Sequence, residues 1–153
     1  FASSRGGSGT DIWKQPAEGG ETVRLTHGGG SAGIESDDGK TFYFSKGRGH
    51  RGLWQIPAAG GPERLVDGLE TAGDWRSWGV SRRGIHFAGE SKGRRHTVQF
   101  FEFLTKKIET LFSIGENALW SHPALAVSPD GREFLVARED HALNEIMLVD
   151  NFR

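Results

Sequence analysis

The sequence contains no cysteine, no strong net charge and no long hydrophobic run. Without cysteine there can be no disulfide, no thiol catalysis and no thiolate metal site. Lysine and arginine number 19 against 20 aspartate and glutamate, so the formal net charge is −1 and no overall field favours nucleic acid or an anionic membrane. No apolar run approaches the ~18 residues of a membrane span. A chain of 153 residues is nevertheless long enough to bury a substantial core.

Motifs of catalysis and cofactor binding are also absent. The sequence has no G-x-S-x-G nucleophile elbow and no Walker-type phosphate loop, and its glycine-rich segment 5–10 lacks the Lys-Ser/Thr ending of one. Asp37, Asp38 and Asp130 have too few acidic neighbours for the roughly six to eight oxygen ligands of Ca²⁺, so we interpret them as turn residues. We therefore assign no catalytic residue, no metal and no cofactor.

The most informative feature that is present is an internal repeat. DIWKQPAEGGETVRLT (11–26) aligns with GLWQIPAAGGPERLVD (52–67), so that Trp13 matches Trp54. ESDDGKTFYFS, VSRRGIHFAG and VSPDGREFLVA also align, with their serines at 36, 81 and 128, which are intervals of 45 and 47 residues. A period in the forties built from short strands is typical of a β-propeller, in which each repeat is a four-stranded blade.

Local patterns favour strands over helices. Turn-forming Asp-Gly pairs are followed by β-forming residues, which is a strong hairpin signal. Only the segment 101–113 could suggest a helix. The repeat argues against one, because Phe101 aligns with Trp13 and Trp54, and Lys106-Lys107 aligns with the Gly-Gly pairs of the earlier repeats.

These patterns predict an all-β partial propeller over residues 1–153, with blades or blade remnants at 1–27, 32–67, 74–113 and 119–153. The predicted strands are near Ala2, 11–16 and 22–26; 32–36, 41–45, 52–57 and 63–66; 74–80, 85–88, 97–104 and 108–112; and 124–128, 133–137 and 144–150. About three and a half blades of four antiparallel strands are thus present, the first without an inner strand and the last without an outer one.

The motifs resemble the TolB-like family of bacterial propeller repeats. The resemblance depends on SPDGR (128–132), SDDGK (36–40) and IWKQPAEGGETVRLT (12–26), and the closing EIMLVDNFR is similar to the C-terminal end of such propellers. It implies a bacterial propeller module, and both a periplasmic and a cytoplasmic location remain open. The SRRGI segment (81–85) departs from the pattern by lacking the aspartate, so we expect a less stable turn there.

An open array of blades leaves strand edges exposed. Two arrangements are compatible with this. The residues could be the C-terminal part of a longer propeller of about six to eight blades, or several copies could join edge to edge. We expect the first.

Candidate binding residues lie on the loops between second and third strands, which share a face with the linkers between blades. They are Arg48, His50, Arg51, Arg94, Arg95, His96, Trp120, His122 and His141. The histidines at 50, 96 and 141 recur with the repeat and could bind a metal or respond to pH, or could simply be solvated. The arginines could hold carboxylate or phosphate groups of a partner, or could serve solubility alone.

The tryptophans have a simpler interpretation. Trp13 and Trp54 occupy equivalent positions in third strands, which predicts packing between blades. Trp75, Trp78 and Trp120 lie near blade junctions, where core packing is favoured over stacking against a sugar or peptide.

Three classes of function remain. The leading hypothesis is a non-catalytic module that binds a protein or small ligand on its loop face, without nucleic acid and without a membrane span. The alternatives are a propeller that gates a separate peptidase-type domain, and an enzyme at the propeller mouth.

Overall fold

The computed structural model describes residues 1–4, 9–47, 50–73, 76–90, 96–115, 125–140 and 143–149. Every regular element in these residues is a β-strand, and the strands form four antiparallel sheets whose spatial order follows the sequence. The first sheet contains β1 (Ala2–Ser3), β2 (Asp11–Lys14) and β3 (Val23–Arg24). The second contains β4 (Ala32–Glu35), β5 (Thr41–Ser45), β6 (Leu53–Pro57) and β7 (Arg64–Leu65).

The third sheet contains β8 (Trp78–Ser81), β9 (Gly84–Glu90), β10 (His96–Glu102) and β11 (Ile108–Gly115). The fourth contains β12 (Leu125–Val127), β13 (Phe134–Asp140) and β14 (Leu143–Val149). The predicted all-β class is confirmed, and the segment 101–113 forms parts of β10 and β11 instead of a helix.

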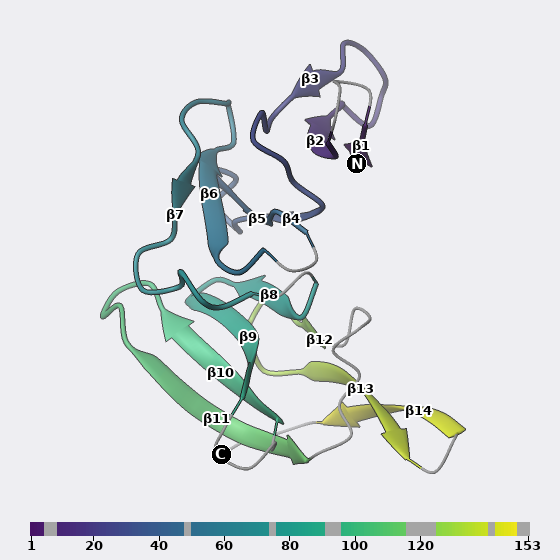
Figure 1. Ribbon diagram of the computed structural model, residues 1–153, viewed down its shortest axis with the longest axis vertical. Helices are drawn as coiled ribbons and strands as arrows, with labels where there is room; N and C mark the ends of the chain where they lie inside the picture. Colours follow the sequence, from purple (N-terminus) through teal and green to yellow (C-terminus); the bar gives the residue numbers. More distant parts are fainter. Residues whose placement is uncertain are drawn as a thin grey trace.

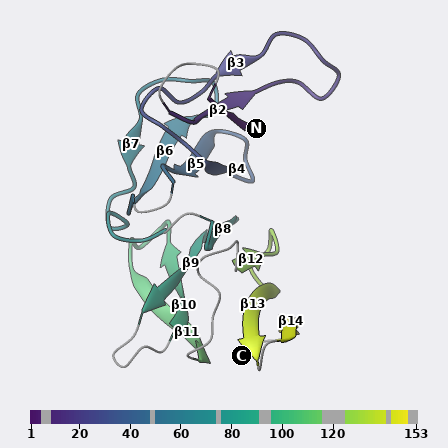
Figure 2. The same ribbon diagram turned by 45° about the vertical axis from the view of Figure 1, so that its right-hand side comes forward.

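The sheets follow one another as the blades of an open propeller. Figure 1 shows β4, β8 and β12 toward the middle of the molecule, with β7 and β11 on the left-hand outside. Contacts between β4 and β8 and between β8 and β12 join these inner strands. The turned view in Figure 2 shows the same succession from the first sheet to the fourth.

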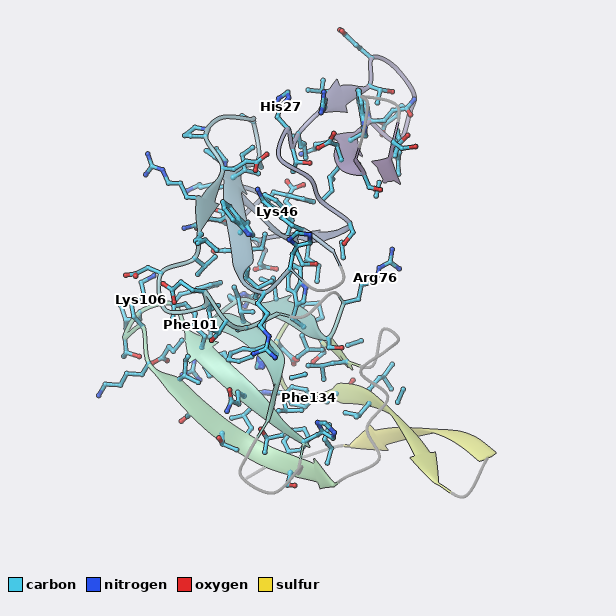
Figure 3. All side chains as sticks on the ribbon, in the orientation of Figure 1. His27, Lys46, Arg76, Phe101, Lys106 and Phe134 are labelled. Carbon is cyan, nitrogen blue, oxygen red and sulfur yellow. The ribbon has the colours of Figure 1, made fainter. Side chains whose placement is uncertain are left out.

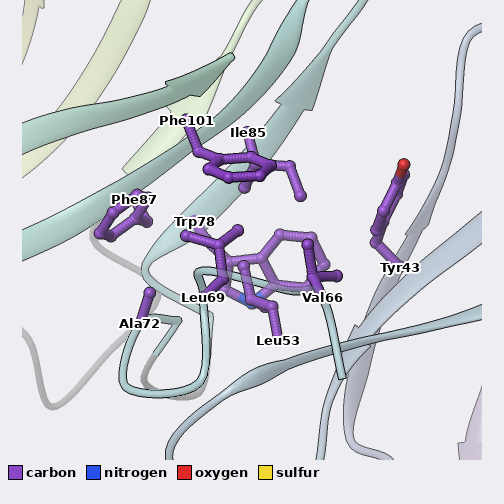
Figure 4. Close-up of a cluster of buried hydrophobic side chains, with 9 residues drawn as sticks. All are labelled: Tyr43, Leu53, Val66, Leu69, Ala72, Trp78, Ile85, Phe87 and Phe101. Atoms are coloured by element: carbon purple, nitrogen blue, oxygen red, sulfur yellow. The ribbon is translucent and has the colours of Figure 1, made fainter. Parts of the chain in front are cut away.

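Each pair of neighbouring sheets encloses its own apolar cluster, because alternate residues of a strand point to opposite faces. Ile12, Leu25, Phe44 and Ile56 fill the space between the first and second sheets. The space between the second and third sheets is filled by Tyr43, Leu53, Val66, Leu69, Ala72, Trp78, Ile85, Phe87 and Phe101 (Figure 4). Val98, Ile114, Leu125, Phe134 and Val136 fill the space between the third and fourth.

The predicted packing between sheets is found for Trp54 and Trp78, whereas Trp13 is half-buried, lines a cavity and belongs to none of the three apolar clusters. Trp78 is 3% exposed and belongs to the cluster between the second and third sheets. Trp54 packs against the cluster of the first two sheets, and the Lys46 Nζ lies 3.7 Å from the centre of its ring. Trp75 and Trp120 lie outside the described residues.

The first-to-second strand turns come in two lengths. In the second sheet four residues separate Ser36 from Thr41, whose carbonyl accepts the Ser36 N–H, and the fourth sheet repeats this between Ser128 and Glu133. In the third sheet Ser81 pairs directly with Gly84, so only Arg82 and Arg83 intervene.

The shorter turn shifts the pairing of β9 against β8 by two residues. In the second sheet Glu35 pairs with Phe42, whereas the aligned residue of the third sheet, Val80, pairs with Ile85 instead of Phe87. The turn without aspartate is therefore formed, but with a different register.

Candidate functional site

The structure describes three of the nine predicted binding residues. His50 and Arg51 are exposed in the loop before β6, and His96 is half-buried at the start of β10, opposite Glu90 and Gly115. The other six lie outside the described residues: Arg48, Arg94, Arg95, Trp120, His122 and His141. Whether the loop residues converge on one site stays a prediction.

Arg51 is held against the linker that joins the second and third sheets. The neighbouring Gly52 N–H donates to the Ala72 carbonyl at 2.9 Å, and Gly52 has a φ of 101°. A Cβ at position 52 would lie 2.9 Å from the Glu70 carbonyl oxygen, so only glycine permits this close approach. The loop carrying Arg51 is thereby positioned over the junction of two sheets.

A cavity of about 320 Å³ opens at this junction, and we call it the junction cavity. It is lined by Arg51, Gly68, Thr71, Ala72, Gly73, Ser77, Phe87, Ala88, Gly89, Gln99 and Ile108. Its residues come from the linker 66–77, from the loop before β6 and from β9, β10 and the start of β11. Among the described parts of the chain, this is where a predicted site residue meets a cavity.

Polar groups line the junction cavity without protein partners. Ser77 is 1% exposed, and its Oγ has no hydrogen-bond partner among the described residues. The side chains of Arg51, Thr71 and Gln99 likewise have no recorded hydrogen bond or ion pair within the described segments. Only Ser77 is fully buried among these residues, and an unsatisfied buried polar group typically costs about 1–3 kcal/mol. Arg51, Thr71 and Gln99 are accessible, so a ligand in the cavity can take the place of water as their hydrogen-bond partner.

Sequence reasoning found Arg51 but missed the rest of this cavity. Ser77 and Thr71 lie in a linker that carries no motif. Gln99 did have a signal, because it lies two residues before Phe101 and therefore on the same face of β10, where a polar residue is unexpected. A Cβ on Gly89 would lie 2.5 Å from the Gln99 amide carbon, so this glycine leaves room for the glutamine.

A larger cavity of about 540 Å³ lies beside the first sheet. Its walls include Trp13, Phe42 and Trp78, together with the Lys14–Glu35 ion pair at 3.1 Å. The second and third sheets have four strands and the first has three, so this space beside β1 is where the other blades carry an inner strand. Its position suits a further strand better than a small ligand.

A third cavity, of about 350 Å³, follows the inner strands β4, β8 and β12. At its edge the turns of neighbouring sheets are joined by Arg82. The Arg82 Nε donates to Asp37 at 2.9 Å, and its backbone N–H donates to the Pro129 carbonyl at 3.0 Å. This contact gives the arginine a role in holding adjacent sheets together.

The turn aspartates behave as structural groups. Ser36 and Ser128 donate their hydroxyls to Asp38 and Asp130 at 2.7 and 2.6 Å. These hydrogen bonds, with backbone N–H groups two residues on, lower the pKa of both carboxyls below the usual value. Among the described residues no group of three or more histidine or acidic side chains could hold a metal ion.

Another polar contact closes the junction of the first two sheets. Glu63 accepts the His27 N–H at 2.6 Å, and its second oxygen lies 3.0 Å from the Lys46 Nζ. Figure 3 labels His27 and Lys46. Burial opposes ionisation of Glu63, but the hydrogen bonds from His27, Lys46 and Gly28 outweigh it and lower the pKa of the carboxyl. Both Glu63 oxygens already accept hydrogen bonds, so we interpret this carboxylate as a structural group and not as a proton acceptor in catalysis.

One serine–histidine pair has the distance expected of a nucleophile and a base. The Ser81 Oγ lies 3.2 Å from the His86 Nε2, while the His86 Nδ1 has no partner among the described residues. Burial lowers the pKa of His86 from 6.5 to about 4. A general base works best with a pKa near the working pH and with a group that orients its ring, so the pair does not fit that role.

The described residues include no helix long and apolar enough to cross a membrane. This finding agrees with the lack of a long apolar run in the sequence.

Comparison with known proteins identifies the fold. No family model matches the chain, and no curated protein matches it by sequence. Among solved structures, TolB from Acinetobacter baumannii matches with a TM-score of 0.71 and 18% identity, covering 98% of this chain and 37% of that one. The chain therefore spans little more than a third of the TolB it matches.

Two other solved structures are similar. An oligogalacturonate lyase from Vibrio parahaemolyticus matches with a TM-score of 0.64 and 15% identity over 91% of this chain and 42% of that one. The tricorn protease matches with a TM-score of 0.52 and 13% identity over 91% of this chain and 15% of that one. Identities this low establish the fold alone. On strand order, sheet packing and these neighbours, the chain has a β-propeller fold whose described sheets form an open array, similar in structure to part of TolB.

Proposed function

We propose that this chain is a non-catalytic propeller module that binds a protein or a small ligand. Its binding face is formed by the loops between second and third strands together with the linkers between sheets. Loops held by a rigid scaffold are a common place for binding residues.

The observation that carries the proposal is the junction cavity. It opens on this face, contains the exposed predicted residue Arg51, and has Ser77, Gln99 and Thr71 as polar groups without protein partners. Its volume of about 320 Å³ lies at the lower end of the usual range for small-molecule pockets. Binding, and not turnover, is the chemistry that these side chains support, since none of them is paired with a base or nucleophile.

The similar structures include a lyase and a protease, so catalytic alternatives exist for the fold. In the part of the chain that the structure describes, the Ser81–His86 contact is the arrangement closest to a catalytic pair, and its histidine is a weak base. We therefore prefer the binding role to both a gating role and an enzyme at the propeller mouth.

Backbone hydrogen–deuterium exchange tests the proposal. The chain is incubated with a defined library of small carboxylates, sugars, amines and nucleotides, and the protection of each segment is measured. We expect a ligand to protect residues 50–53 and 66–73. Protection confined to the opposite turns at 36–40, 82–84 and 129–132 would overturn the binding face, and no protection with any compound would overturn the small-ligand role. Chemical conversion of a library compound would overturn the non-catalytic role.

A further inference from the structure

We infer that the junction cavity binds a small organic carboxylate that also carries hydroxyl groups, an inference that depends on the proposed binding face. The cavity lies between the two four-stranded sheets. Its described lining residues all belong to those two sheets and to the linker between them, and none of them comes from the first or the fourth sheet.

The carboxylate is assigned by Arg51. Arg51 is exposed, lines the cavity and has no ion-pair partner among the described residues. A guanidinium presents its N–H groups as a planar fork that matches the two oxygens of a carboxylate. The described lining residues include no aspartate or glutamate that would compete for it.

The hydroxyl groups are assigned by the interior of the cavity. The Gln99 amide both donates and accepts hydrogen bonds, and so does the Thr71 hydroxyl. A ligand hydroxyl is also both a donor and an acceptor, so it can satisfy either group. Thr71 is exposed and Gln99 is half-buried, so both side chains are accessible to a bound molecule.

The remaining walls limit the size and polarity of the ligand. Ala72 and Phe87 come from the apolar cluster between the second and third sheets, and Figure 4 shows them on the same side of that cluster. Ile108 lines the cavity from the start of β11. A carbon skeleton can contact these side chains while its oxygen atoms face Arg51, Thr71 and Gln99.

The experiment compares two molecules that differ in one group. Gluconate and sorbitol have the same six-carbon polyol skeleton, but gluconate has a carboxylate where sorbitol has a hydroxymethyl group. Affinity is measured by isothermal titration calorimetry, and the side-chain amide signal of Gln99 is followed by NMR. We expect gluconate to bind at least tenfold more tightly than sorbitol and to shift the Gln99 signal.

Variants separate the two parts of the site. Arg51→Gln should weaken gluconate about tenfold while leaving sorbitol unchanged, because only the charge-assisted contact is removed. Thr71→Val, which removes the exposed hydroxyl but keeps the shape of the side chain, should weaken both molecules by a similar factor. Arg64→Gln is the matched control, since Arg64 is an exposed arginine of the same sheet that does not line the cavity.

Equal affinity for the two molecules, or an unchanged affinity for gluconate in Arg51→Gln, would overturn the inference. Failure of gluconate to bind would overturn it as well. If a compound without a carboxylate protected residues 50–53 and 66–73 from exchange, the proposed binding face would be supported and only the inference of a carboxylate ligand would be overturned.

Discussion

The two faces of the third sheet are built from the same strands but differ in chemistry. Toward the second sheet, β9 and β10 present Ile85, Phe87 and Phe101 to a cluster without ionisable side chains, Tyr43 apart. Toward the fourth sheet they present His86, which is 4% exposed and packs on Phe100 and Phe134 at ring distances of 4.6 and 5.1 Å. One junction should therefore tolerate acid, whereas the other should be weakened by it.

The largest effect is expected from Phe101→Ala, which removes a fully buried ring from the junction of the second and third sheets. We expect a loss of about 3–5 kcal/mol in the free energy of unfolding, because the substitution leaves a cavity. In a repeat protein such a break separates the halves on either side, so urea unfolding followed by circular dichroism should become biphasic.

Leu104→Ala is the control for this change. Leu104 is 90% exposed at the tip of the β10–β11 hairpin, so its truncation should alter stability by no more than about 0.5 kcal/mol. A single unfolding transition of unchanged midpoint in Phe101→Ala would show that the junction does not couple the two halves.

Acid should act at the other junction through His86. Its pKa is about 4 in the folded chain against an ordinary 6.5, so the unfolded chain binds the extra proton between these values. The free energy of unfolding is therefore unaffected by His86 protonation above pH 6.5, and it decreases as the pH falls from 6.5 toward 4. We expect a loss of about 2 kcal/mol between pH 7.5 and 5, measured by urea unfolding at each pH.

His86→Leu tests the origin of that loss. The described groups packed on the ring are Ser81, Phe100 and Phe134, none of which is charged. Leucine cannot be protonated, so the variant should lose most of the decrease between pH 7.5 and 5. A decrease of the same size in the variant would assign the acid sensitivity to other groups.

Two glycines provide the smallest test of the comparison. Gly68 and Gly131 have φ values of 88° and 75°. A Cβ on Gly68 would lie 3.3 Å from the Phe101 ring, and a Cβ on Gly131 would lie 3.3 Å from the His86 Nε2. We expect Gly68→Ala and Gly131→Ala each to lower the free energy of unfolding by about 1–2 kcal/mol at pH 8, because alanine is strained in the left-handed backbone conformation that both glycines adopt. Thermal unfolding of both variants would measure this loss of stability. A loss at only one of the two positions would show that local packing, and not the backbone conformation, determines the effect.

The fold was largely predictable because its signals are local and repeated. The aligned serines and Asp-Gly turns located the hairpins, and the alignment of Lys106 with the glycine pairs is supported by its φ of 58°, a conformation that usually requires glycine. The register of β9 was not predictable, since a letter-by-letter alignment hides the difference between a four-residue and a two-residue turn.

The candidate site was less predictable than the fold. Arg51 stands out as a cation in a repeated loop. The junction cavity, however, depends on where the described linker residues 66–73 and 77 lie relative to β9 and β10, which no periodic pattern in the sequence indicates. The buried state of His86 was also hidden, because its place in the aligned repeat is taken by Thr41 in the second sheet and Glu133 in the fourth.

The two-residue shift of β9 has a consequence for how such blades can change in length. Because side chains alternate between faces, removing two residues from a hairpin leaves every later side chain on its original face, whereas removing one would turn Ile85 and Phe87 away from the second sheet. Insertions and deletions in these hairpins should therefore survive in even numbers, so that turn length can diversify among blades while the packing between them is inherited unchanged.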